Sequence, residues 1–411
     1  MRWSPFRHNK GMRKRSVKLS GSKPYVQVVS RIFSPEPAAA SFRLEALVKG
    51  LAKTGVRVRV LTTIPAPGNN RSLRSRADDL PDVSIKRVQA KRDSSGYIRG
   101  YFSYLSFDIP AFFRLLFSPV PEVYVSEPPP TTGAVVRLVA ALKRRPYVYY
   151  AADIWSDATR TMKVPFFVEP ALRMVERFAL RGAAAVITPN PEFEVRCNEL
   201  GSKHTFMIRN GIDVEVFTDR GNKPDPTGGA NPDGDWLVYA GTASTWQGSE
   251  VFVKAFSTIA DEFPSARLLF LGSGPATAML RELSERVVPG RVFFSKVPME
   301  QAAAWQRNAK AVLASIQPGI GYEDAYLTKV FAGLACETPV IYAGPGPAVK
   351  DIERFNLGIA VPWDETAVSQ AMSDILSGKV NFSGLRDWTI RNHSIEDTGR
   401  KAAEVVKRLL S

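Results

Sequence analysis

Short apolar runs rich in β-branched and aromatic residues alternate with longer segments of helical spacing, and this alternation occurs twice along the 411-residue chain. Segment 42–55 has helical apolar spacing and ends at a glycine, and 56–63 alternates as a strand does. Strands that alternate with helices indicate a parallel sheet with helices on both faces. The other runs that we expect to form strands, some of them continuing into a loop, are 25–30, 122–130, 146–155, 183–189, 236–241 and 266–274.

The second set of strands follows segment 221–235, which is rich in Pro, Gly and Asp and reads as a long loop. We therefore predict an α/β protein with two Rossmann-like domains, at 24–200 and 201–385. A ligand cleft is expected between them, at the carboxyl ends of the strands. The last segment, 386–411, is expected to form a helix that packs back on the N-terminal domain.

Composition excludes some classes of protein. The chain is 45% hydrophobic and 23% charged, which is ordinary for a globular protein with a large core. Cys197 and Cys336 lie far apart, and His8, His204 and His393 are scattered. Neither a disulfide framework nor a metal site is expected from this pattern, and a reducing cytoplasmic compartment fits it.

The formal net charge of +15 favours a negatively charged partner, which is a nucleic acid, an anionic membrane or a phosphorylated substrate. Part of this charge lies in a basic tail, 1–23, that contains no acidic residue. No apolar run of the secretory type follows the tail. It reads either as a disordered tail, with Met12 as an alternative start, or as a contact to a membrane surface. No aromatic and basic interleaving supports binding of nucleic acid.

Segment 101–120 is rich in Phe, Tyr and Leu, but Asp108 and Pro110 interrupt it, so it does not read as a membrane span. An amphipathic segment at the membrane interface fits the pattern, with Phe112, Phe113 and Leu116 as candidate contacts. The alternative is an ordinary core helix of the N-terminal domain.

A lysine stands at the start of a predicted helix in the segment YLTKVFAGLACETPVI (326–341). The first N–H groups of a helix are unpaired and its dipole is positive at that end, so a helix start attracts anions. Lys329, next to Thr328, therefore suggests a phosphate site.

Several blocks together resemble the GT-B glycosyltransferases of family 4, in particular the bacterial surface-polysaccharide subgroup related to fucosamine transferases. The resemblance spans roughly residues 25 to 380. It implies that the N-terminal domain faces the acceptor and that the C-terminal domain binds a nucleotide sugar. The blocks, in order, are 34–65, 104–107, 123–133, 153–157, 208–217, 239–244, 271–275 and 328–341.

On the acceptor side, the loop 34–41 follows the first strand, where anions and sugars are usually bound. The candidates are Ser34 and Ala40 in this loop and Arg43 just after it, and the guanidinium of Arg43 can bind a phosphate with two donors. The alternative for Arg43 is a solvated or salt-bridged surface residue. Asp153 and Trp155 follow a strand and are expected to point into the cleft, although Asp153 also fits a helix N-cap.

On the donor side, the resemblance leads us to expect a basic residue in the loop 241–250, but none is present. Gly241 and Thr242 are expected to offer backbone N–H groups instead. Lys329 is then the main candidate for the leaving diphosphate. The turn that contains Gly272 and Gly274 is expected near the nucleotide.

The family's pair of glutamates, which has seven residues between its members, is altered in this chain. The second position, which binds the ribose in the family, is Ala332, and the first falls on Asp324 beside Glu323. Glu337 stands where the family has glycine, and it replaces the missing glutamate only if the backbone differs. The resemblance therefore implies a site with one carboxylate and without the ribose contact.

The activity implied is transfer of a sugar from a nucleotide sugar, UDP-linked rather than GDP-linked, to a lipid-linked or polysaccharide acceptor with retention of configuration. A hexosyl or N-acetylhexosaminyl group is expected to be transferred, without a metal and without a further cofactor. The protein is expected in the cytoplasm, peripheral at the inner face of the plasma membrane. The alternative is a catalytically silent GT-B protein that binds or scaffolds a partner.

Overall fold

The N-terminal domain is built on a parallel sheet. The computed structural model describes residues 23–36, 38–65, 75–93, 98, 100–158 and 166–410. In this part of the chain the sheet has seven strands in the order β3-β2-β1-β4-β5-β6-β7. The strands are β1 (Tyr25–Val29), β2 (Arg57–Thr63), β3 (Val83–Val88), β4 (Val123–Ser126), β5 (Tyr147–Tyr150), β6 (Ala185–Thr188) and β7 (Thr205–Met207).

Helices cover both faces of this sheet, which explains why its central strands are buried along their whole length. Val26 and Val28 of β1 pack in one core with α1 and α14, while Val29 packs in another with α2, α3 and α5. The helices of this domain are α1 (Ala39–Ala52), α2 (Tyr101–Leu116), α3 (Pro130–Leu142), α4 (Trp155–Ala158), α5 (Val168–Gly182), α6 (Pro191–Glu199) and α14 (Ile395–Lys407), with a 3₁₀ turn η1 (Arg76–Asp79).

The C-terminal domain repeats this architecture on a parallel sheet of six strands, counted over the same described residues, in the order β10-β9-β8-β11-β12-β13. Its strands are β8 (Asp235–Ala240), β9 (Ala266–Leu271), β10 (Val292–Ser295), β11 (Ala311–Ser315), β12 (Val340–Ala343) and β13 (Gly358–Val361). Its helices are α7 (Glu250–Ile259), α8 (Thr277–Val287), α9 (Met299–Arg307), α10 (Thr328–Ala335), α11 (Pro347–Phe355), α12 (Glu365–Leu376) and α13 (Leu385–His393), with a 3₁₀ turn η3 (Thr245–Gln247). The expected α/β architecture with two Rossmann-like domains is confirmed.

The chain crosses between the domains twice, and the two crossings lie side by side. The N–H of Ile212 donates to the carbonyl of His393 (2.7 Å), and the N–H of Ile395 donates to the carbonyl of Ile212 (2.9 Å). A Cβ on Gly211 would lie 2.5 Å from the nitrogen of Ile395, so this close approach requires glycine.

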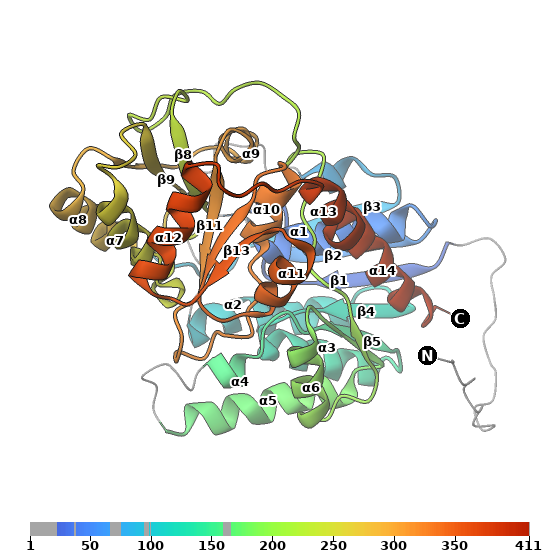
Figure 1. The fold of residues 1–411 in the computed structure, drawn as a ribbon. Coiled ribbons are helices and arrows are strands. Elements are labelled where there is room, and N and C mark those ends of the chain that lie inside the picture. Colours follow the sequence, from blue (N-terminus) through green and yellow to red (C-terminus); the bar gives the residue numbers. More distant parts are fainter. Residues whose placement is uncertain are drawn as a thin grey trace.

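The last two helices belong to different domains. Helix α13 packs on α10 of the C-terminal domain, whereas α14 packs along α1 of the N-terminal domain. Figure 1 shows α14, in dark red, beside the blue strands and helix of the chain's N-terminal part. A Cβ on Gly399 would lie 2.3 Å from the carbonyl oxygen of Ala46, so small residues let α1 and α14 approach closely. Segment 386–411 thus contributes to both domains.

Candidate active site

Each sheet has one topological switch point, where successive strands turn to opposite sides. In the N-terminal sheet it lies between β1 and β4, and in the C-terminal sheet between β8 and β11. Ligands of open parallel sheets bind outside the carboxyl ends of the strands at this point. Ser30 and Glu127 follow the first pair of strands, and Gly241 and Ile316 follow the second. The site is therefore sought around these residues.

Lys329 lies at the switch point of the C-terminal sheet, in the first turn of α10. Its Nζ lies 3.6 Å from the ring centroid of Tyr239 and donates a hydrogen bond to Oε1 of Gln247 (3.1 Å). The Tyr239 hydroxyl donates to the same Gln247 oxygen. Burial holds the pKa of Lys329 well below its ordinary value. Gln247 and Tyr239, which the sequence analysis did not single out, thus position an ammonium group that lacks a carboxylate partner among the described residues.

The N-terminus of α10 is open to an anion. Leu327 at the N-cap offers no side-chain hydrogen bond, and no acidic residue lies in the first turn. Thr328 and Lys329 are both partly exposed there. Unpaired N–H groups beside a lysine suit an anion, and the phosphate expected at Lys329 stays a prediction.

The loops after β8 and β9 contact one another at their glycines. A Cβ on Gly272 would lie 2.3 Å from the carbonyl oxygen of Gly241, and one on Gly274 would lie 2.3 Å from that of Ala243. Close packing of the two loops therefore explains Gly272 and Gly274 without a ligand. Gly241 and Thr242 are exposed, and Gly241 approaches the Lys329 side chain, so these two remain candidates for contact with the donor.

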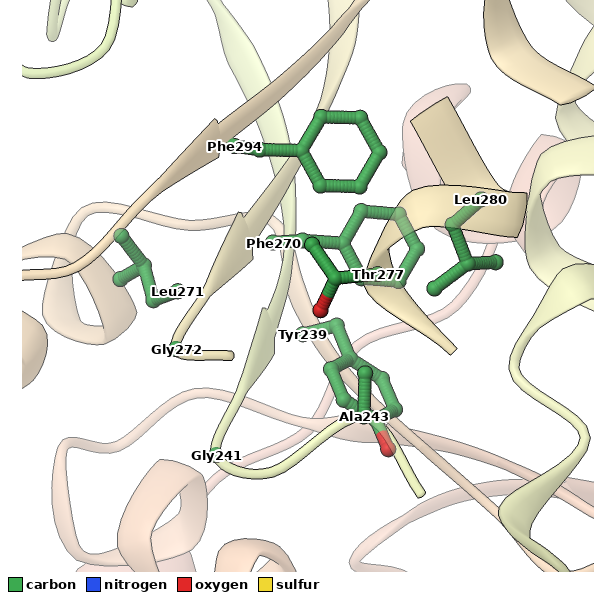
Figure 2. A pocket seen from close by; sticks show the side chains of 9 residues that line it. All are labelled: Tyr239, Gly241, Ala243, Phe270, Leu271, Gly272, Thr277, Leu280 and Phe294. Atoms are coloured by element: carbon green, nitrogen blue, oxygen red, sulfur yellow. The ribbon is translucent and has the colours of Figure 1, made fainter. Parts of the chain in front are cut away.

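Figure 2 shows a hollow beneath these loops, where the rings of Phe294, Phe270 and Tyr239 follow one another. The hollow has no room for a water molecule, so it is no ligand pocket in this structure. Its lining is Tyr239, Gly241, Ala243, Phe270, Leu271, Gly272, Thr277, Leu280 and Phe294. The row of rings supports Tyr239, which in turn supports Lys329.

Of the two candidate carboxylates that precede α10, Glu323 accepts hydrogen bonds within the protein and Asp324 is more available. Oε1 of Glu323 accepts hydrogen bonds from the N–H groups of Gly319 (2.6 Å) and Ile320 (3.0 Å), so Glu323 shapes its own loop. Asp324 is exposed, but the protein around it partly desolvates its carboxyl. This desolvation, together with the negative charges of Glu192 and Glu323, raises the pKa of Asp324. Asp324 is therefore the freer of the two candidate carboxylates.

Ala332 and Glu337 do not supply the missing ribose contact. Ala332 is 5% exposed and packs in an apolar cluster with Phe217, Ala303 and Cys336. Glu337 adopts the left-handed conformation usual for glycine (φ 60°), and its carboxylate accepts from the first N–H groups of α13. Glu337 therefore caps a helix.

In the N-terminal domain, Arg43 is buried and paired. Its Nη2 donates to Oε2 of Glu127 (3.0 Å), and Ser30 donates to the other oxygen of Glu127 (2.7 Å). Both residues of this ion pair are almost fully buried, so Arg43 is not the surface residue that the sequence analysis offered as the alternative to a phosphate ligand. The pair links α1 to the end of β4 and fixes the floor of the switch point.

Asp153 keeps a carboxylate available to a ligand. It is exposed and has no hydrogen bond or ion pair within the described residues, yet the protein around it desolvates the carboxyl and raises its pKa. Asp153 is not a helix N-cap, because Glu176 accepts the N–H groups of Trp155 and Ser156 at the start of α4. The charge of Asp153 also acts on Tyr322 of the C-terminal domain, whose pKa is raised, chiefly by burial.

The two switch points face each other through a short series of contacts. Tyr322 stacks on Trp246, with ring centroids 4.6 Å apart, and Trp246 directly precedes the Gln247 that holds Lys329. Asn190 of the N-terminal domain donates to the carbonyl of Asp324 (2.8 Å). These contacts connect the surroundings of Asp153, Asp324 and Lys329 across the two domains through Trp246 and Tyr322, which the sequence analysis did not single out. The roles of the three predicted residues stay predictions.

The remaining acceptor-side candidates are more peripheral. The carbonyl of Ser34 accepts from Arg87 (3.0 Å), and Ala40 lies partly exposed in the first turn of α1. Trp155 packs edge-on against Tyr104 of α2 (centroids 5.5 Å apart). Beside these rings lies Arg31, two residues after the end of β1, which the sequence analysis overlooked. Its position just after the predicted strand 25–30 is the sequence feature that could have identified Arg31 as a candidate.

Helix α2 presents an apolar stripe to solvent. The exposed members recur every three or four residues and are Phe102, Leu105, Ile109, Phe113 and Phe117, with Phe102 81%, Phe113 53% and Phe117 83% exposed. Phe112 is partly buried and packs against the core, and its ring lies edge-on to that of Phe113 (centroids 5.4 Å apart), so Phe113 is the better placed of the two for the membrane contact that stays a prediction. Leu116 is partly exposed. Within the described residues, none of the helices has the length and apolar character needed to cross a bilayer.

Two Rossmann-like domains whose switch points face each other define the GT-B class of glycosyltransferase folds. Residues 39–211 match the family described as Glycosyl transferase 4-like domain, and residues 234–378 match Glycosyl transferases group 1. The chain therefore belongs to the glycosyltransferases that combine these two domains. No curated protein sequence matches it.

Solved structures with this fold cover nearly the whole chain. Sucrose-phosphate synthase from Thermosynechococcus elongatus is 19% identical, with a TM-score of 0.66 over 94% of this chain and 96% of that one. Anabaena HepE, solved with UDP and glucose, is 14% identical (TM-score 0.66; 93% and 99%). A protein from Listeria monocytogenes described as a UDP-N-acetylglucosamine 2-epimerase is 13% identical (TM-score 0.60; 94% and 96%). At these identities the similarity establishes the fold.

Proposed function

We propose that this protein transfers a sugar from a nucleotide sugar to a lipid-linked or polysaccharide acceptor, with retention of the anomeric configuration. The observation that carries the proposal is the position of Lys329 in the first turn of α10, at the switch point of the C-terminal sheet. Negative charge builds on the leaving diphosphate as the glycosidic bond breaks. An ammonium group and helix N–H groups that are already in place stabilise this charge.

Asp153 acts on the other side of the reaction in this proposal. Its exposed carboxylate orients an acceptor hydroxyl, and its charge reaches Tyr322, whose ring stacks on Trp246 beside the Gln247 that holds Lys329. Because Lys329 supplies the positive charge, no metal is required. Closure of the two domains excludes water and so limits hydrolysis of the donor.

The donor and acceptor are proposed at the level of chemical class. Anabaena HepE, which has this fold, was solved with UDP and glucose, which supports a UDP-linked hexose or N-acetylhexosamine as donor. The sequence blocks similar to fucosamine transferases support an acceptor of surface-polysaccharide synthesis.

Turnover of a panel of UDP-, GDP-, ADP- and dTDP-sugars, with and without EDTA, tests this proposal. We expect release of a nucleoside diphosphate from a UDP-sugar, unchanged by EDTA. A silent GT-B scaffold is the second candidate, favoured by the apolar surroundings of Ala332 and by the absence of Lys and Arg from 241–250. Nucleotide binding without turnover of any donor, in the presence of prenyl-linked saccharides, would favour the scaffold.

We further propose that the protein binds the cytoplasmic face of an anionic membrane through α2 and its neighbours. Helix α2 packs beside α3, and α3 beside α5. The outer sides of α3 and α5 expose further apolar residues, namely Leu138, Leu142, Met174 and Phe178. Exposed cations accompany them, namely Arg114, Arg144, Arg145, Arg177 and Arg181. Apolar side chains among cations suit an anionic lipid surface. The basic tail 1–23, also proposed to bind there, lies outside the described residues except for Lys23.

Liposome co-sedimentation should show binding to anionic vesicles that weakens as salt is added, because exposed charges are screened beyond about 8 Å at physiological ionic strength. The double variant Phe113→Ser/Phe117→Ser should lose most of this binding and keep its fold, since both rings face solvent. Phe355→Ser, at an exposed position of the C-terminal domain, is the matched control and should bind as the parent does. Equal binding by the double variant and the control would rule out α2 as the contact.

A further inference from the structure

Arg31 is a buried cation whose hydrogen-bonding capacity is used only in part. The residue is 4% exposed, and its Nε and Nη1 have no hydrogen-bond partner among the described residues. Its guanidinium carbon lies 4.0 Å from the ring centroid of Tyr104 and 6.0 Å from that of Trp155. Aromatic faces attract a cation but accept no strong hydrogen bond.

The two carboxylates whose charges act on Arg31, Asp108 and Glu127, already accept hydrogen bonds from other residues. Asp108 accepts one hydrogen bond on each oxygen, from Thr131 and Thr132 (2.6 Å each). Glu127 has Ser30 on one oxygen and Arg43 on the other. These carboxylates therefore act on Arg31 at a distance but do not pair with it.

The buried charge of Arg31 would be stabilised by a bound anion. Burial lowers the pKa of Arg31, and the opposing effects of Tyr104, Asp108 and Glu127 are smaller. An ionised side chain taken out of water without a direct partner is costly, and a bound anion would offset this cost.

The position of Arg31 indicates which ligand would bring that anion. Arg31 follows β1 at the switch point of the N-terminal, acceptor-side sheet, whereas Lys329 lies at the switch point of the C-terminal sheet. Its ring partner Tyr104 belongs to α2, whose outer side carries the exposed Phe102 and Leu105. A single helix thus joins the cation to the apolar stripe. Tyr104 and Trp155 are themselves partly exposed, so the guanidinium lies just beneath these rings.

We propose that Arg31 binds a phosphate group of a lipid-linked acceptor, with the lipid chain along the apolar stripe of α2. The inference rests on the proposed function and names the part of the acceptor that the N-terminal domain recognises. Arginine suits phosphate because its charge is permanent and its several N–H donors are fixed in one plane. Arg31 is a binding residue in this proposal and takes no part in bond breaking.

The test compares binding of farnesyl diphosphate, inorganic pyrophosphate and UDP to the parent protein, to Arg31→Met and to Arg31→Lys. Arg286→Met, at an exposed position of α8, loses the same charge elsewhere and is the control. We expect farnesyl diphosphate to bind about 10-fold to 100-fold more weakly to Arg31→Met, with partial recovery in Arg31→Lys. UDP binding should not change. Equal binding of farnesyl diphosphate by Arg31→Met and Arg286→Met would overturn the proposal, as would equal binding of pyrophosphate and farnesyl diphosphate by the parent.

A second measurement holds even if the Arg31 variants fail to fold. Because the Trp155 ring lies beside Arg31, farnesyl diphosphate bound there should change the tryptophan fluorescence of the parent, and Trp155→Phe should lose that change. A fluorescence change that persists in Trp155→Phe would place the ligand elsewhere. The proposed function is judged separately, by turnover of nucleotide sugars, so its failure and the failure of this inference are distinguishable.

Discussion

Lys329→Ala is expected to lower turnover about 100-fold to 1,000-fold, the usual effect of removing one preorganised group that stabilises charge in the transition state. The fold should survive, because Lys329 is partly exposed and forms no ion pair within the described residues. Turnover should fall more than donor binding does, since the diphosphate gains charge only as the bond breaks. Initial-rate kinetics over a range of donor concentrations measures both quantities.

The dependence on pH gives an independent signature of Lys329. Because burial lowers its pKa, the ammonium form is lost as pH rises through that lowered pKa. The parent's rate should therefore decline toward high pH, and Lys329→Ala should lack this decline. Lys350→Ala, at an exposed position of α11, is the control and should behave as the parent does. A Lys329→Ala variant within a few-fold of the parent would exclude Lys329 as the diphosphate anchor.

Ala332→Glu is expected to destabilise the protein by about 3 kcal/mol at pH 7, because a carboxylate enters an apolar cluster without a partner. Burial raises the pKa of such a carboxyl above its unfolded value of about 4.3. The loss of stability should therefore grow as pH rises from about 4.3 through the raised pKa. Urea unfolding at pH 5 and pH 8 measures this difference.

Ala332→Gln controls for side-chain size, and its loss of stability should not depend on pH. If the ribose lies beside position 332, saturating UDP should raise the melting temperature of Ala332→Glu more than that of Ala332→Gln, since the carboxylate gains hydroxyl partners. A glutamate variant as stable as the parent at both pH values would contradict the burial of Ala332 in the apolar cluster.

The parts of the structure that could be predicted from sequence are those set by local pattern. Alternating strands and helices were sufficient to indicate two parallel sheets, and Lys329 was found because a helix start imposes its chemistry on the residues there. The partner of Arg43 could not be found in this way, because Glu127 lies 84 residues further along the chain. Phe112 and Phe113 are neighbours in an apolar run, and only packing on the sheet shows which of them faces the core.

The adjoining interdomain crossings and the return of α14 to α1 have a consequence for how this protein is made. The N-terminal domain consists of two separate pieces of chain, and the second piece is synthesised only after the whole C-terminal domain. Until then Leu47 and Leu51 of α1 lack part of their apolar cover, which Ala402 and Val406 of α14 supply. Domains generally fold as units during synthesis, but this one cannot be completed until α14 has been synthesised. A fragment that ends after the first interdomain crossing should therefore expose the apolar face of α1 and aggregate. A nascent chain stalled before α14 should be bound by chaperones for the same reason.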